Sequence, residues 1–168
     1  MKERSIRILL WGSTVICMAV IFMFSVQDAD RSADTSDGFI NSIMQIVIPK
    51  YDEMEPDEIS DTVSSLSHTV RKTAHFSLYC LLGILCSASV GRYGIGQIPR
   101  AVSSLAISIS YAVSDEVHQY FVPGRACRFT DILIDAAGAA IGVSMVLAAS
   151  AIRKHSGTAR TSRDVRIS

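Results

Sequence analysis

The chain has 168 residues, of which 49% are hydrophobic and only 7% aromatic, and its mean hydropathy is positive. Its 16 basic and 16 acidic residues balance to a formal net charge of zero. This composition is unusual for one soluble domain and favours membrane-spanning segments. It excludes nucleic-acid binding for practical purposes, because the basic clusters are short and lie next to apolar runs. A chain of this length leaves room for one domain.

Four apolar runs predict transmembrane helices. The first, residues 8–26, is uncharged and long enough as a helix to cross the roughly 30 Å hydrocarbon layer. Its length, and the absence of a small-residue cleavage site after it, favour an uncleaved anchor over a signal peptide. The other spans are expected at about residues 72–90, 99–120 and 131–152. The predicted fold class is an all-α membrane protein, a four-transmembrane-helix bundle.

Short extracytoplasmic helices are predicted between spans one and two. One begins after Ser36 or Asp37 and ends before Pro49. Its apolar residues recur at helical spacing: Phe39, Ile40, Ile43, Met44 and Val47. This helix lies either on the membrane surface or packed on other residues of the connection. A second helix is expected to begin at Pro56, with an apolar face that runs toward span two.

The Lys and Arg residues predict the orientation. Basic residues before span one, at Arg92 and Arg100 between spans two and three, and after span four fall on one side, which the positive-inside rule makes cytoplasmic. The opposite side receives residues 27–70, which hold ten acidic residues and two basic ones. We therefore expect a multi-pass protein of the cell membrane with cytoplasmic N- and C-termini and a polar cytoplasmic tail at residues 153–168.

The stretch SDEVHQYFVPGR, residues 114–125, is charged where a membrane-seeking chain is normally apolar. The uncharged part of span three, residues 101–114, rises only about 21 Å as a helix, against the roughly 30 Å to be crossed. The helix must therefore continue until Pro123-Gly124 turns the chain. Its last turns then hold four polar residues at the outer boundary: Asp115, Glu116, His118 and Gln119.

Spans two and four bring further polar residues to the same depth. Arg71, His75 and Tyr79 recur every four residues and share one helix face. Asp131 and Asp135 have the same spacing in span four. A charge within a span costs about 2.5–3.5 kcal/mol on insertion scales unless it is paired or hydrated, so these residues predict a shared polar pocket that opens outward.

Close helix packing is predicted in span four. Gly138 and Gly142 are four residues apart on a face lined by alanine, a spacing that lets two helix backbones approach each other.

Three strings resemble the VanZ-like membrane protein family over nearly the whole chain. They are RKTAHFSLY, SDEVHQYFVPGR and the pattern D-x-x-x-(N/D)-x-x-G that begins at Asp131. The matching positions are Arg71, Lys72, His75, Phe76, Tyr79, Asp115, Glu116, His118, Gln119, Phe121, Pro123, Gly124, Arg125, Asp131 and Gly138. The resemblance implies an envelope protein associated with glycopeptide (teicoplanin) resistance, without naming a reaction. Position 135, commonly Asn in the family, is Asp here and adds a carboxylate.

One hypothesis is that the pocket binds an anionic group of a membrane lipid or a lipid-linked envelope precursor. Guanidinium groups suit phosphate and carboxylate because they donate two parallel hydrogen bonds. The alternative use of these cations is to pair with the carboxylates and hold the bundle together. The expected ligand-binding residues are Arg71, Lys72, Tyr79, Gln119, Arg125, Asp131 and Asp135.

A second hypothesis is a membrane-embedded enzyme acting on such a substrate. His75 or His118 would serve as general base, with Asp115 or Glu116 orienting it or sharing the proton. No cofactor and no metal are expected, because Glu116 and His118 lie on different helix faces and pairing with arginine is the better use of the carboxylates. The sequence leaves the oligomeric state open.

Overall fold

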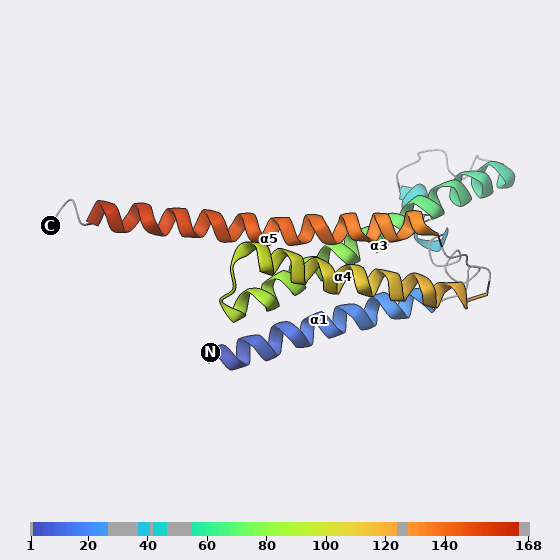
Figure 1. Ribbon diagram of the computed structural model, residues 1–168. Helices are drawn as coiled ribbons and strands as arrows, with labels where there is room; N and C mark the ends of the chain where they lie inside the picture. Colours follow the sequence, from blue (N-terminus) through green and yellow to red (C-terminus); the bar gives the residue numbers. More distant parts are fainter. Residues whose placement is uncertain (1, 27–36, 41, 47–54, 124–127, 165–168) are drawn as a thin grey trace.

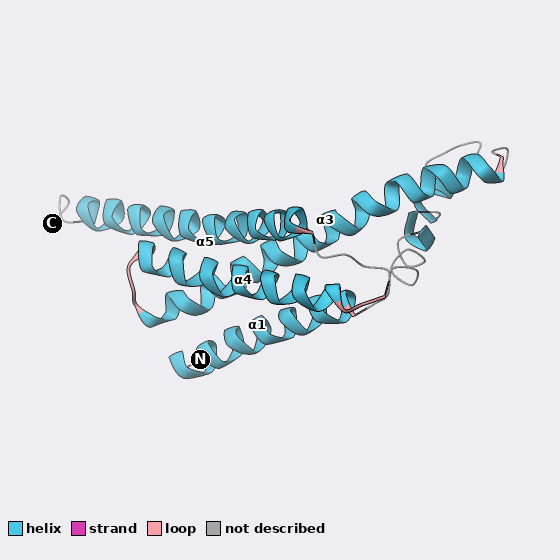
Figure 2. Cartoon of the chain, turned by 45° about the vertical axis from the view of Figure 1, so that its right-hand side comes forward, coloured by secondary structure: helices cyan, strands magenta, loops and turns pink. Residues whose placement is uncertain are grey.

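The computed structural model describes residues 2–26, 37–40, 42–46, 55–123 and 128–164. Within these ranges the chain is helical almost throughout and has no strand (Figure 2). The predicted all-α class is therefore confirmed.

Four long helices pack side by side over part of their lengths (Figure 1). They are α1 (Glu3–Ser25), α3 (Pro56–Val90), α4 (Gln97–Tyr120) and α5 (Phe129–Asp164). The short 3-10 turn η2 (Gly91–Tyr93) follows α3, and Gly94 then adopts a φ of 71°. Glycine enters this left-handed region without the steric cost of a Cβ, which lets the chain reverse into α4.

Three helices are long and apolar enough to cross a membrane: residues Glu3–Ser25, Thr69–Tyr93 and Phe129–Lys154. The 24 residues of α4 rise about 36 Å, so α4 has the required length. It is more polar than the other three because its buried face is formed by Ser104, Ser108, Ala112, Asp115, Glu116 and Gln119. The polar face of α4 is thus turned into the bundle and away from lipid.

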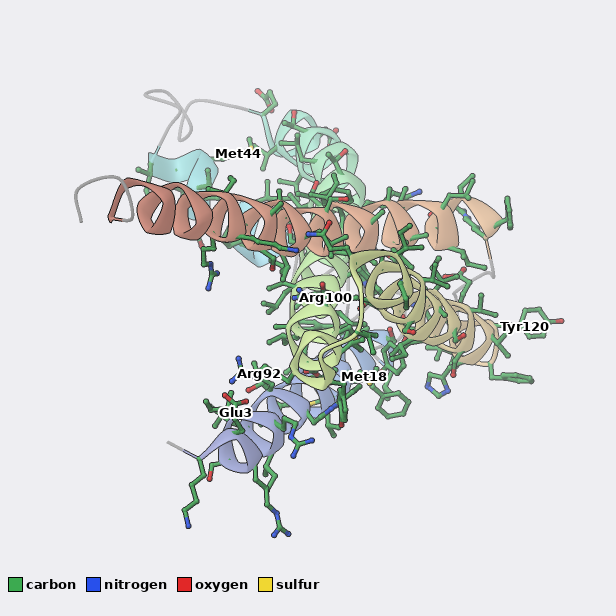
Figure 3. All side chains as sticks on the ribbon, turned by 60° about the vertical axis from the view of Figure 1, so that its left-hand side comes forward. Glu3, Met18, Met44, Arg92, Arg100 and Tyr120 are labelled. Atoms are coloured by element: carbon green, nitrogen blue, oxygen red, sulfur yellow. The ribbon has the colours of Figure 1, made fainter. Side chains whose placement is uncertain are left out.

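The helix expected at Pro56 and span two form one continuous helix, α3. Proline suits its first turn, where the missing N–H has no helical partner. Residues 37–40 and 42–46 are also helical, and Ile40 and Met44 pack against Val63 of α3. Met44 is labelled in Figure 3. This segment was expected either on the membrane surface or packed against other residues of the connection. Its buried side chains show the second arrangement.

Helices α3 and α5 are in backbone contact through glycine. A Cβ on Gly138 would collide with the carbonyl oxygen of Phe76, and a Cβ on Gly142 would collide with that of Cys80. Both glycines therefore let the two helices approach more closely than any side chain allows. The predicted role of this pair is confirmed.

The start of α1 and the end of α3 meet at what we call the Arg92 end, formed by Glu3, Trp11, Arg92, Tyr93 and Arg100. Arg92 donates to both carboxylate oxygens of Glu3 at 2.7 Å (Figure 3). The indole N–H of Trp11 donates to the hydroxyl of Tyr93 at 3.2 Å. These contacts tie α1 to η2.

Arg100 also belongs to the Arg92 end, and its side chain points into the bundle. Its Nε donates to the backbone oxygen of Ser87 at 2.8 Å, and its Nη1 donates to the hydroxyl of Ser150 at 3.1 Å. Gly91 makes room for it, since a Cβ there would lie 2.5 Å from the guanidinium carbon. A residue counted in the sequence among the basic residues of a connection thus links α3, α4 and α5.

Candidate polar site at the other end of the bundle

A buried polar cluster lies where α1 ends and where α4 approaches its last turn. In α4, Asp115 is 4% exposed, Glu116 2% and Gln119 8%. Asp135 of α5 is 4% exposed, and Tyr79 of α3 is fully buried. We call this region the Asp115 end; it comprises these five residues together with Ser25, Arg71, Lys72, His75, Arg128 and Asp131.

One oxygen of Asp115 is held by a triangle of hydrogen bonds. Ser25 Oγ of α1 donates to Asp115 Oδ2 at 2.8 Å, and Gln119 Nε2 donates to the same oxygen at 3.1 Å and to Ser25 Oγ at 3.2 Å. The second oxygen, Oδ1, is buried and has no hydrogen bond within the described part of the chain. The carboxylate is therefore oriented through one oxygen and leaves the other unused.

His75, Asp115 and Asp135 converge from three different helices. One ligand atom from each, a ring nitrogen and two carboxylate oxygens, lies within 4.8 Å of the other two. Tyr79 sits one helical turn after His75, and both aspartates lie close enough to act electrostatically on its hydroxyl. That hydroxyl is buried and has no hydrogen-bond partner among the described residues.

Lys72 and Asp131 form an ion pair at the rim of the site. Lys72 Nζ lies 2.6 Å from Asp131 Oδ1, and each side chain is 29% exposed. Nearby, the backbone N–H of Arg128 donates to Glu116 Oε1 at 2.5 Å, which joins the start of α5 to the last turns of α4. The rim is thus partly exposed, whereas Asp115, Glu116 and Asp135 behind it are buried.

Two arginines of the rim have no carboxylate partner among the described residues. Arg71 Nε donates to the backbone oxygen of Ser67 in its own helix, at 3.4 Å. Arg128 is exposed, and neither arginine forms an ion pair within the described ranges. Pairing with a carboxylate, the alternative use expected for these cations, is therefore seen for Lys72 and, within the described ranges, not for Arg71.

His118 faces α1. Its ring centroid lies 4.9 Å from that of Phe22, and its Nε2 is buried without a hydrogen bond in the described chain. It does not join the group formed by His75, Asp115 and Asp135. The two histidines considered as general bases thus occupy different surroundings.

The predicted site residues therefore separate into groups. The half-buried His75 lies close to four buried residues, Tyr79, Asp115, Gln119 and Asp135; adjoining them are Lys72, Glu116 and Asp131. Arg71 lies at the rim, His118 lies against α1, and Arg125 is outside the described residues. Ser25 was missed by the sequence analysis, although its position at the exit of span one places a hydroxyl at the depth of Asp115.

Comparison with known proteins gives one match. A family model described as VanZ/LLP1 matches residues 10–150. We found no matching curated protein and no matching solved structure. The matched range begins within α1 and ends within α5, so it includes the whole polar cluster.

Proposed function

Because the chain belongs to the VanZ/LLP1 family of VanZ-like membrane proteins, we propose that its Asp115 end binds an anionic group of a membrane lipid or a lipid-linked envelope precursor. The setting that the family suggests is glycopeptide (teicoplanin) resistance. The observation that supports this function best is the pair of rim arginines, Arg71 and Arg128, which lack an ion pair among the described residues.

The chemistry of arginine explains why these two cations matter. Guanidinium groups bind phosphate and carboxylate through parallel hydrogen bonds, and they are weakly hydrated, so they suit the membrane surface. Lys72 is occupied by Asp131, which leaves the arginines as donors to an external anion. A ligand bound at the rim would lie beside the buried carboxylates without having to displace them.

Lipid binding by the purified full-length protein tests this function. In native mass spectrometry with phosphatidylglycerol and phosphatidylcholine, we expect preference for the anionic lipid. Arg71→Ala combined with Arg128→Ala should reduce that preference about tenfold, which corresponds to about 1.4 kcal/mol. Arg92→Ala is the matched control at the opposite end. Equal binding of both lipids, or an equal loss in the control, contradicts the proposal.

Arg125 is proposed as a further donor on the basis of the sequence. Arg125→Ala should express and insert at near-normal levels and abolish any teicoplanin resistance conferred by the protein. If the residue instead compensates a buried carboxylate, its removal costs about 3–5 kcal/mol, and the variant would unfold early in detergent melts. Early unfolding would therefore assign Arg125 to structure and not to ligand binding.

We also propose that both termini are cytoplasmic and that the Asp115 end faces outward. The start of α1 and the last part of α5 point to the same end of the bundle (Figure 1), and the Lys and Arg residues favour the cytoplasm for it. In a cysteine-free background, Glu53→Cys should react with an impermeant maleimide in intact cells and Arg160→Cys should not. The reverse pattern means that the orientation is inverted.

A second candidate, a membrane-embedded enzyme, is favoured by the convergence of His75 with Asp115 and Asp135. A carboxylate beside an imidazole can orient it and share its proton. On this proposal His75 is the general base, whereas His118, packed on Phe22, is not. Comparing the resistance phenotypes of His75→Ala and His118→Gln separates the two histidines.

A further inference from the structure

We propose that His75, Asp115 and Asp135 form a binding site for a divalent transition-metal cation, with Zn²⁺ the ion that fits best. The sequence alone favoured pairing of these carboxylates with arginine. In the structure, no ion pair with arginine is formed by Asp115 or Asp135 within the described ranges. The proposal stands on different residues from those of the anion-binding rim, so neither depends on the other.

The ligand set matches zinc chemistry. One imidazole nitrogen and two carboxylate oxygens are common zinc ligands, at about 2.0–2.2 Å from the ion. Tetrahedral ligands at those lengths are about 3.4 Å apart, and here the three atoms lie within 4.8 Å of one another. Side-chain rotations that draw them together by about an ångström complete the geometry without moving a helix.

A second observation points to a ligand at the same place. The hydroxyl of Tyr79 is fully buried and has no hydrogen bond in the described chain, and the same holds for Asp115 Oδ1. Buried polar atoms without a partner are rare in folded proteins and call for an ion or a water molecule. A cation between the two aspartates would take up the free oxygen of Asp115, and the Tyr79 hydroxyl, which lies close to both carboxylates, could then donate to one of them.

Charge and orientation support the same inference. Two carboxylates that are each 4% exposed lie together, and the ion pair of the nearest described lysine is made with Asp131. A divalent cation neutralises both charges in a region of low dielectric constant. Ser25 and Gln119 hold Asp115 through its other oxygen, as outer-shell partners do for metal-bound carboxylates.

Metal content and thermal melts of the full-length protein in detergent test the site. After stripping with EDTA, wild type should take up one Zn²⁺ per chain and melt at a higher temperature with Zn²⁺ than without. His75→Ala and Asp135→Asn should each weaken Zn²⁺ binding at least about tenfold. His118→Ala is the matched control, from the same end of the bundle, that should keep it.

The competing arrangement is a proton shared by Asp115 and Asp135, which requires no metal. Wild type that takes up no stoichiometric Zn²⁺, or a control that loses binding as much as the cluster variants, would overturn the metal site. If the variants do not fold, electron paramagnetic resonance of Cu²⁺-loaded wild type decides the matter. One coordinated imidazole nitrogen is expected, and either none or two would contradict the assignment.

Discussion

The charged residues at the two ends of the bundle differ in how far they are paired. At the Arg92 end, Arg92 binds Glu3 and Arg100 binds backbone and hydroxyl oxygens of two other helices. At the Asp115 end and among the described residues, Arg71 donates to a carbonyl of its own helix without forming an ion pair, and Asp115 keeps one buried oxygen without a hydrogen bond. The first arrangement holds helices together, and the second leaves donors and acceptors available for a ligand.

This difference indicates which end of a small membrane bundle is the better candidate for a functional site. Ionisable residues within spans are costly, so they persist where they are paired for stability or where they meet a ligand. The Arg92 end satisfies the first condition. At the Asp115 end, Lys72 and Asp131 satisfy it, whereas Asp115 behind them keeps one buried oxygen without a hydrogen bond among the described residues.

The largest effect is expected at His75. His75→Ala should abolish any teicoplanin resistance that the protein confers, because it removes the one imidazole that converges with the two buried aspartates. The same cells with His118→Gln should retain most of it. Teicoplanin susceptibility, compared at equal membrane expression of the two variants, measures both effects. Equal loss in the two variants would mean that the distinction between the histidines is wrong.

Arg100→Ala should destabilise the Arg92 end and with it the bundle. The change removes charge-assisted hydrogen bonds to Ser87 and Ser150, and leaves acceptors unsatisfied, at a cost of about 1.5–3 kcal/mol. Arg71→Ala, the matched change at the other end, should leave the melting temperature nearly unchanged. Melts followed by the fluorescence of Trp11, which bonds to Tyr93, report on this end directly.

Asp135→Asn should stabilise the metal-free protein. It keeps the side-chain shape and relieves the close approach of two buried acidic groups, which should raise the free energy of unfolding by about 1 kcal/mol. Melts in EDTA measure the gain. With Zn²⁺ present, wild type should be more stable than Asp135→Asn, since only wild type is stabilised by binding the ion. A variant less stable than wild type in EDTA would show that Asp135 is already compensated.

The smallest effect is expected for the pair between Glu3 and Arg92. The side chain of Glu3 is 71% exposed and that of Arg92 33%, and ion pairs on surfaces contribute about 0–1 kcal/mol. Glu3→Gln should therefore shift the melting temperature only slightly, and less at high salt. A large shift would show that this contact anchors α1 more strongly than its exposure suggests.

Much of the architecture could be predicted from residue patterns. The apolar runs locate the four helices, and the length of span three requires a helix that continues through Asp115 and Glu116. The four-residue spacings of His75 with Tyr79 and of Gly138 with Gly142 predict faces that the structure shows buried or in contact. These features depend on local periodicity, which a single sequence records.

The rotation of each helix about its axis could not be predicted. Asp115 and His118 are three residues apart and share a broad face, yet Asp115 meets Ser25 whereas His118 meets Phe22. That distinction depends on where α1 packs. The inward path of Arg100 was missed for the same reason, because it requires the space that Gly91 leaves in another helix.

The glycine contact between α3 and α5 has a mechanical consequence. His75 and Asp135 stand on two helices whose backbones touch at Gly138 and Gly142, so these two backbones cannot come closer together. Asp115 stands on α4, outside this contact. A turn of α4 by one residue position, about 100°, would carry its carboxylate away from the other two residues. We therefore expect a rotation of α4 to open the site without breaking the glycine contact.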